Sequence, residues 1–259
     1  MKAMSKLLVA SVVLCVGVYV GLCIYLWFSQ RTYLYHPTGR MADVPSFVLE
    51  RSDADIVVSV DAAERRSAVV YFGGNAEDVS GSIAQLSEAF PDADIYAMHY
   101  RSYGGSTGSP SESTLVADGV ALYDRVRRSH QAVTIVGRSL GSGIAIQVAA
   151  ERPTDRLVLV TPYYSIVDLA AEHFSLFPVR LLLRDRFESW RYAGKLMVPV
   201  TLIVAGNDQV IPAASSAKLA RSFPEGLART VVIRGADHND VSGFAEYAQA
   251  LRGLPTKVH

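Results

Sequence analysis

Three residues that together could activate a hydroxyl nucleophile occur in the order Ser139, Asp208, His238. A serine hydroxyl reacts poorly until a base takes its proton, and a histidine base works best when a carboxylate fixes its tautomer. Ser139 lies in a G-x-S-x-G pattern at residues 137–141, where glycines allow a sharp turn. A glycine-rich turn with a bystander serine would also give this pattern. The chemistry that the set predicts is attack of Ser139 on a carbonyl carbon.

His238 is the histidine best placed to be the base, because it follows the last predicted strand. His99 also ends a predicted strand, but that strand precedes the nucleophile, so packing or substrate contact suits it better. We expect ordinary surface or packed positions for the remaining histidines, which are His36, His130, His173 and His259.

Asp208 is the predicted acid because it follows the strand before His238, ahead of a proline-containing helix start. Asp237 is adjacent to His238, and neighbouring side chains rarely face each other well. Asp168 is the second choice. The order Ser, Asp, His, with each residue after its own strand, is more specific than any single member of the set.

An anionic oxygen formed at the carbonyl needs backbone N–H donors. The predicted strand 68–72 runs into Gly73, Gly74 and Asn75, where glycines allow close approach. We assign one donor to the N–H of Leu140 and the other to Gly74 or Asn75. The alternative is a simple glycine turn that caps the next helix.

The elements that must position these residues alternate between apolar strands and helical patterns. Strands are predicted at 47–49, 56–60, 68–72, 95–99, 132–136, 157–161, 200–205 and 230–233. This alternation predicts a mainly parallel eight-stranded sheet with helices on both faces, whose active site lies at the carboxyl ends of the strands. Ser109, Pro110 and Glu112 predict a capping box, with proline at its first turn, for one of these helices.

The uncharged residues 7–28 predict a transmembrane helix, because a helix of this length spans a hydrocarbon core of about 30 Å. Tyr25, Trp27 and Phe28 suit an interfacial aromatic belt better than a signal-peptide cleavage site. Basic residues flank the run, at Lys2 and Lys6 before it and at Arg31 and Arg40 after it. With the amino terminus added, the N-terminal side carries about one more positive charge, which predicts a cytoplasmic N-terminus and a periplasmic or extracytoplasmic domain.

Gly17 and Gly21 form a small-xxx-small pair that would let two such anchors pack as a weak dimer, although glycine is common in membrane helices. Charge is balanced, with 25 basic and 25 acidic residues, so nucleic acid is not an expected partner. Both cysteines, Cys15 and Cys23, lie in the apolar run. The chain therefore predicts no disulfide framework, no thiolate metal site and no cysteine nucleophile; we expect no metal or organic cofactor.

An insert at residues 162–199 separates two predicted strands and mixes large apolar side chains with basic ones. It is either an amphipathic cover for the core or a cap that supplies an apolar acyl pocket near anionic lipid. We assign substrate binding to four residues, which are Tyr103, Phe174, Phe177 and Leu181.

Several stretches together resemble one branch of the α/β-hydrolase superfamily, that of single-span, membrane-anchored serine hydrolases similar to acyl-protein thioesterases. They are F-G-G-N-A-E (72–77), Y-R-S-Y-G-G-S-T-G-S-P-S-E (100–112), G-R-S-L-G (137–141), Asp208 with Val210 and Pro212, and G-A-D-H-N-D (235–240). Relatives usually carry histidine where Gly73 stands, and often glycine at Ser102 and Asp237.

The sequence pattern predicts an anchor at 1–31, a stalk at 32–45 and a domain at 46–259, with the cap insert at 162–199. The resemblance implies that this domain is an α/β-hydrolase. It implies hydrolysis of carboxylic esters or thioesters of lipid-like or acylated substrates. An acyltransferase or a serine peptidase would show the same motifs. A non-catalytic membrane-tethered scaffold is the third alternative, and the intact Ser139, Asp208 and His238 argue against it.

Overall fold

The computed structural model describes residues 2–41 and 43–254. Met1 of the predicted anchor, residue 42 of the predicted stalk and residues 255–259, with His259, lie outside the described part. The strands are β1 (Ser46–Glu50), β2 (Asp55–Asp61), β3 (Ser67–Phe72), β4 (Ala93–Met98), β5 (Ala132–Arg138), β6 (Arg156–Val160), β7 (Val200–Ala205) and β8 (Ala228–Ile233). Each overlaps one predicted strand.

The strands form one sheet in the order β1-β2-β4-β3-β5-β6-β7-β8. Among the described strands, β1 with β2 and β2 with β4 pair antiparallel, and the pairs from β4 to β8 are parallel. The predicted mainly parallel eight-stranded sheet is therefore confirmed. The carboxyl ends of the parallel strands meet at one edge, where the candidate site lies.

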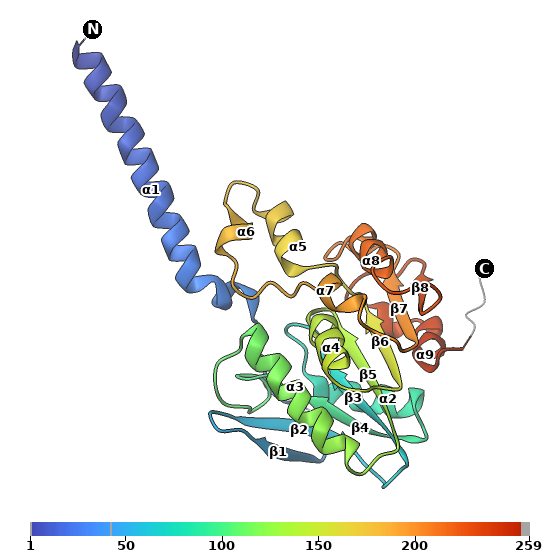
Figure 1. Cartoon of the computed structure of the whole chain (residues 1–259). Coiled ribbons are helices and arrows are strands. Elements are labelled where there is room, and N and C mark those ends of the chain that lie inside the picture. The colour runs from blue at the N-terminus through green and yellow to red at the C-terminus, as the bar shows by residue number, and fades with distance from the viewer. Residues whose placement is uncertain (1, 42, 255–259) are drawn as a thin grey trace.

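Both faces of the sheet are covered by helices (Figure 1). In β3, Ala68, Val70 and Phe72 face one core, and Val69 and Tyr71 face the other. The first core packs against α3 (Glu112–Arg127), α4 (Leu140–Glu151) and α8 (Ala213–Ala220), and the second against α2 (Ile83–Ala89) and α9 (Ala245–Arg252). Burial on both sides explains why inner strands such as β3 and β7 are almost continuously apolar rather than alternating. Two short 3-10 helices, η1 (Val79–Ser82) and η2 (Val241–Gly243), complete the second face.

The predicted capping box of α3 is wrong by two residues. Ser111 is the N-cap: its hydroxyl accepts from the N–H of Thr114, and the Thr114 side chain accepts from the N–H of Ser111. Glu112 is thus the first helical residue, and its carboxylate instead accepts hydrogen bonds from the N–H groups of Arg186 and Phe187 in the insert.

The N-terminal helix α1 (Lys2–Leu34) projects away from the sheet (Figure 1). Its stretch from Met4 to Leu34 is long and apolar enough to cross a membrane, and the mean hydropathy of its 18-residue window is 2.7. The helix continues past the predicted anchor boundary, and residues 35–38 of the predicted stalk lie against the domain, where Tyr35 is buried and the Thr38 hydroxyl donates to the carbonyl of Glu77. Gly17 and Gly21 have no other part of the described chain against them, so the pairing of two anchors stays a prediction.

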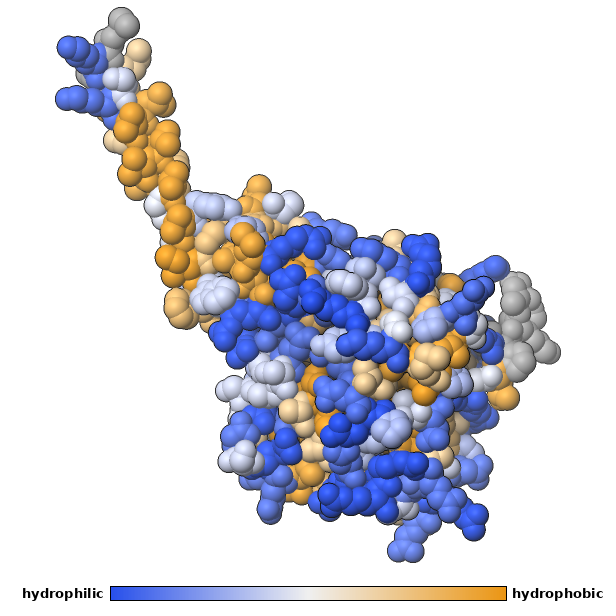
Figure 2. Space-filling view, in the orientation of Figure 1, coloured by the Kyte–Doolittle hydropathy of each residue, from blue (hydrophilic) through white to orange (hydrophobic). Residues whose placement is uncertain are grey.

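The insert, which we call the cap (residues 162–199), contains α5 (Ile166–His173), α6 (Val179–Leu182) and α7 (Trp190–Ala193). Its α5–α6 part lies beside the end of α1 that joins the domain (Figure 1). In Figure 2, the apolar colour of α1 continues onto this part of the cap, while the surface of the lower domain is largely hydrophilic.

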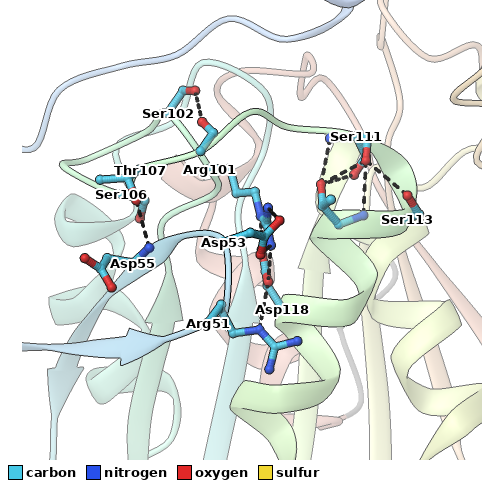
Figure 3. A network of polar contacts seen from close by, with 12 residues as sticks. Arg51, Asp53, Asp55, Arg101, Ser102, Ser106, Thr107, Ser111, Ser113 and Asp118 are labelled. Carbon is cyan, nitrogen blue, oxygen red and sulfur yellow. Dashed lines mark hydrogen bonds and ion pairs between the residues drawn. The ribbon is translucent and has the colours of Figure 1, made fainter.

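A network of ion pairs fastens α3 to the loop after β4 (Figure 3). Asp118 is fully buried and accepts from Nε and Nη2 of Arg101 at 2.8 and 3.1 Å, and from Nε of Arg51 at 3.2 Å. Arg101 also pairs with the exposed Asp53. Ser102 follows it at φ 70°, a conformation that favours glycine, and its hydroxyl donates to the carbonyl of Gly108.

We expect Asp118→Asn to lower the free energy of unfolding by about 3–5 kcal/mol, since it leaves the buried Arg101 without its main counter-charge. Asp124→Asn is the matched control, because Asp124 lies on the same helix and pairs with Arg152 at the surface. There the expected loss is below about 1 kcal/mol. Denaturant unfolding of the full chain in detergent measures the free energy of unfolding of both variants. Equal decreases in the two would contradict the view that burial makes the Asp118 ion pair the more important one.

Candidate active site

The chain turns sharply between β5 and α4, and Ser139 occupies the turn at φ 49° and ψ −118°. A Cβ on Gly141 would overlap the carbonyl oxygens of Phe72 and Gly73, and one on Gly137 would overlap Gly141 and Ala145. Glycine is therefore required at both flanks, as a strained strand-to-helix turn needs. The turn places Ser139 at the N-terminus of α4, whose partial positive charge favours a developing anion.

The structure brings Ser139, His238 and Asp208 into one hydrogen-bonded chain. Nε2 of His238 lies 2.9 Å from Oγ of Ser139, and Nδ1 of His238 lies 2.8 Å from Oδ2 of Asp208. A carboxylate can only accept, so the proton on the ring is at Nδ1 and Nε2 is free to accept from the serine hydroxyl. This is the arrangement that lets a histidine act as general base toward a serine.

Asp208 is held firmly in this position. Its Oδ1 accepts from the N–H groups of Val210 and Ile211 at 2.9 and 2.7 Å, which leaves Oδ2 for His238. Burial opposes ionisation of the Asp208 carboxyl, but the hydrogen bonds from His238 and from these two N–H groups outweigh it. The pKa of Asp208 therefore lies below its usual value, and the carboxylate is charged at neutral pH.

The alternative residues are engaged elsewhere. Asp168 pairs with Arg180 at 2.5 Å and with Lys218 at 3.8 Å. Asp237 accepts from the N–H groups of Gln209 and His238 and so supports the loop. His99 is buried against Ser59, and burial lowers its pKa to about 4. Packing, one of its two expected roles, accounts for its position.

Of the predicted oxyanion donors, Leu140 and Asn75 line the pocket beside Ser139, and within the described chain neither backbone N–H has a hydrogen-bond acceptor. The assignment of Gly74 as an oxyanion donor must be corrected, because its N–H already donates to Oε2 of Glu77 at 2.6 Å. A carboxylate acceptor competes strongly with a carbonyl substrate for that N–H. The candidate donors are therefore the N–H groups of Leu140 and Asn75.

Tyr103, assigned to substrate binding from the sequence, instead lies behind Asn75. It is buried, and its hydroxyl donates to Oδ1 of Asn75 at 2.8 Å. The N–H of His36 donates to both Oδ1 of Asn75 and the Tyr103 hydroxyl, while Nδ2 of Asn75 donates to the carbonyl of Leu34. The end of α1 is thus bonded directly to the turn that carries a candidate oxyanion donor.

Glu77 and Arg138 are two polar residues of the site that sequence reasoning missed. Besides Gly74, Glu77 accepts from Tyr71, Ser82 and Arg138. Arg138 also donates to the carbonyl of His238 at 3.3 Å. Together they join the turn after β3, the turn after β5 and the loop that carries His238. The only sequence signal was their position inside the two motifs at 72–77 and 137–141.

The pocket above Ser139 has a volume of about 430 Å³, within the usual range for small-molecule sites. Its lining is mostly apolar, with Glu172, His173 and Gln209 among its polar members; the apolar members are Leu34, Leu140, Tyr163, Ile166, Leu169, Val210, Ile211 and Pro212. Of the predicted substrate residues, Phe174 and Phe177 line a second cavity, and Leu181 is exposed and lines neither. Among residues 2–41 and 43–254, no group of three or more His, Cys, Asp or Glu is placed to hold a metal ion.

Comparisons with known proteins agree with this fold. Residues 63–189 match the family described as serine aminopeptidase, S33. The uncharacterized protein Rv2307c of Mycobacterium tuberculosis is 31% identical over 239 residues, covering 85% of this chain and 84% of that protein. Alpha/beta hydrolase domain-containing protein 17B of Xenopus tropicalis is 27% identical over 201 residues, covering 73% and 66%.

Among solved structures, Est1E from Butyrivibrio proteoclasticus with bound ferulic acid superposes with a TM-score of 0.66 at 13% identity, covering 80% of this chain and 96% of that one. The sheet order and the serine turn between β5 and α4 define an α/β-hydrolase. With the sequence relatives added, the chain belongs to the α/β-hydrolase superfamily, and the predicted resemblance to it is confirmed.

Proposed function

We propose that the protein is a membrane-anchored serine hydrolase that cleaves carboxylic esters or thioesters with lipid-like acyl groups. The observation that carries the proposal is the hydrogen-bonded chain from Ser139 through His238 to Asp208 at the floor of an open pocket. The mostly apolar lining favours an acyl group over a charged small substrate.

The proposed reaction has two halves. Oγ of Ser139 attacks the carbonyl carbon while its proton passes to Nε2 of His238, and the oxyanion receives hydrogen bonds from the N–H groups of Leu140 and Asn75. The carbonyl re-forms, the bond to the alcohol or thiol breaks, and that leaving group takes the proton from His238. Water then repeats the sequence on the acyl-enzyme, releasing the acid and restoring the serine.

A serine peptidase is the second candidate. The family description names an aminopeptidase, and the carboxylate of Glu172 lines the pocket, where it could pair with a substrate amino group. An acyltransferase would use the same acyl-enzyme but release it to an alcohol. The three reactions differ in the bond that is cleaved or in the acceptor that takes the acyl group.

The test compares nitrophenyl esters of increasing chain length with aminoacyl nitroanilides, using the full chain in detergent. The proposal expects ester turnover and no measurable anilide cleavage. Addition of a primary alcohol separates the third candidate, since a transferase would form a new ester in preference to the free acid. Anilide cleavage, with or without ester hydrolysis, would replace the proposal with the peptidase, and turnover of neither would favour the scaffold.

We also propose that the N-terminus of α1 is cytoplasmic and the domain extracytoplasmic, because Lys2, Lys6 and the amino terminus together carry about one more positive charge than Arg31 and Arg40. Protease added to intact cells or spheroplasts should digest the domain. Protection of the domain in intact spheroplasts, with digestion only after lysis, would reverse the orientation.

A further inference from the structure

A second cavity lies between α1 and the cap, and both supply its walls. Its volume is about 330 Å³ and its lining is almost entirely apolar. From α1 come Leu22, Tyr25, Leu26, Gln30, Tyr33 and Leu34, and from the cap come Ile166, Ala170, Phe174, Phe177, Val179, Leu182 and Leu183. We call this cavity the anchor–cap groove.

The anchor–cap groove adjoins the pocket above Ser139, because Leu34 and Ile166 line both cavities. The end of a linear molecule in the groove therefore lies next to the pocket that holds the serine hydroxyl.

Polar contacts fix the two walls against each other. Arg31 at the end of α1 makes a two-pronged ion pair with Asp185, at 2.8 and 3.1 Å. Gln30 donates to the carbonyl of Leu182 at 3.1 Å and accepts from the N–H of Arg184 at 2.7 Å. The contacts make the groove a built feature of the fold, because such a bidentate pair adds geometric specificity.

The cap reaches alongside the uncharged part of α1. The hydroxyl of Tyr19 donates to the carbonyl of Leu176 at 3.0 Å, and its ring stacks on Phe177. Tyr19 lies within the uncharged residues 7–28, so this tip of the cap lies at the depth of the hydrocarbon if α1 crosses a bilayer. Leu176 at this tip is 83% exposed, and Leu181 on α6 is 80% exposed, which suits contact with lipid and not with water. Figure 2 shows this apolar colour beside α1.

We propose that the anchor–cap groove takes the acyl chain of an ester lipid directly from the surrounding bilayer and presents its carbonyl to Ser139. The inference rests on the proposed hydrolase function and adds where the substrate comes from and what holds it. A chain that enters here passes from hydrocarbon to an apolar groove without crossing water, which favours a membrane lipid over a soluble ester. The anchor is then one wall of the substrate site as well as a tether.

The test fills the groove and asks for a change in chain-length preference. Ala170→Trp on α5 places a large side chain in the groove, and Ala171→Trp is its matched control, because Ala171 lines neither cavity. The full chain in phosphatidylcholine vesicles is given nitrophenyl butyrate and nitrophenyl palmitate. For Ala170→Trp, the palmitate-to-butyrate ratio of kcat/KM should fall by at least about tenfold, as expected if two or more methylene groups stay outside the groove. The control should keep the wild-type ratio.

A second pair of variants acts from the other wall and does not depend on the folding of the cap. Leu22→Trp on α1 should lower the same ratio, and Val20→Trp, which lines neither cavity, should not. Delivery from the bilayer also predicts that the palmitate rate follows its mole fraction in the vesicles at a fixed total concentration. A rate that stays constant while the mole fraction changes would mean entry from water and would overturn the inference.

The failure of this inference and the failure of the proposed function give different results. If the wild type hydrolyses both esters and the filled variants keep its ratio, the groove does not hold the acyl chain, and the hydrolase function stands. If the wild type hydrolyses neither ester and cleaves an aminoacyl nitroanilide, the proposed function is itself wrong, and the inference falls with it.

Discussion

Ser139→Ala is expected to lower kcat on a nitrophenyl ester by about a millionfold, the loss found when a serine nucleophile is removed from a triad. The reason is that no other hydroxyl lies within hydrogen-bond distance of Nε2 of His238 in the described chain. The residual rate would come from substrate binding and the N–H groups of Leu140 and Asn75. Steady-state kinetics, with the release of nitrophenol in the first turnover, measures the effect.

Ser142→Ala is the matched control for this substitution. Ser142 lies one turn further along α4, and its hydroxyl donates to the carbonyl of Ser139 at 2.7 Å instead of facing the histidine. We expect its loss to change kcat less than tenfold, which is about the weight of one neutral hydrogen bond. Ser139 would be rejected as the nucleophile if Ser139→Ala kept more than about a tenth of the wild-type activity. It would also be rejected if only the control Ser142→Ala lost activity.

Asp208→Asn should lower kcat by about ten-thousandfold with little change in the fold. An amide at this position can present N–H to Nδ1 of His238, which favours the tautomer whose Nε2 carries a proton and cannot accept one from Ser139. The lowered pKa of Asp208 means that the native carboxylate is charged throughout the neutral range.

Asp168→Asn is the control for the acid, since Asp168 was the second choice from the sequence and pairs instead with Arg180 and Lys218. Its activity should stay within about tenfold of the wild type, as for a partly exposed ion pair. A larger loss at Asp168 than at Asp208 would show that the acid had been assigned to the wrong strand end.

The strands could be predicted because the sheet is buried on both faces. In a chain where apolar runs alternate with helical patterns, short apolar β-branched runs such as 68–72 and 132–136 are typical of buried strands. The order of the strands in the sheet was not predictable. β4 lies between β2 and β3, and this exchange depends on connections between distant residues. The start of α3 was misplaced because Ser109 and Ser111 are both good N-caps, and only the bond between Ser111 and Thr114 distinguishes them.

The candidate site was predictable to the extent that chain order encodes it. Parallel strands end at one edge, so residues that follow β5, β7 and β8 must converge there. Competition for hydrogen bonds is not encoded in this way: the carboxylate of Glu77 takes the N–H of Gly74, and the hydroxyl of Tyr103 holds Asn75. These contacts depend on side-chain directions within turns, which spacing does not fix.

The anchor–cap groove was the feature least predictable from the sequence. Its walls come from α1 and from residues roughly 150 positions away, as the pair Arg31 and Asp185 illustrates. Phe174 and Phe177 were expected near the substrate on composition alone, and the structure places them in the groove. The sequence offered two roles for this insert, an amphipathic cover for the core and a cap. Phe187 packs in the core, as a cover would, and Phe177 lines the groove, as a cap residue would.

The most direct test of the central claim is covalent. The full chain in detergent is treated with a fluorophosphonate probe, digested and mapped by mass spectrometry. Nucleophilic activation by His238 predicts one adduct on Ser139, its absence in Ser139→Ala, and undiminished labelling in Ser142→Ala. No adduct on the folded wild type, or an adduct on another serine that persists in Ser139→Ala, would contradict the assignment of Ser139 as the activated nucleophile.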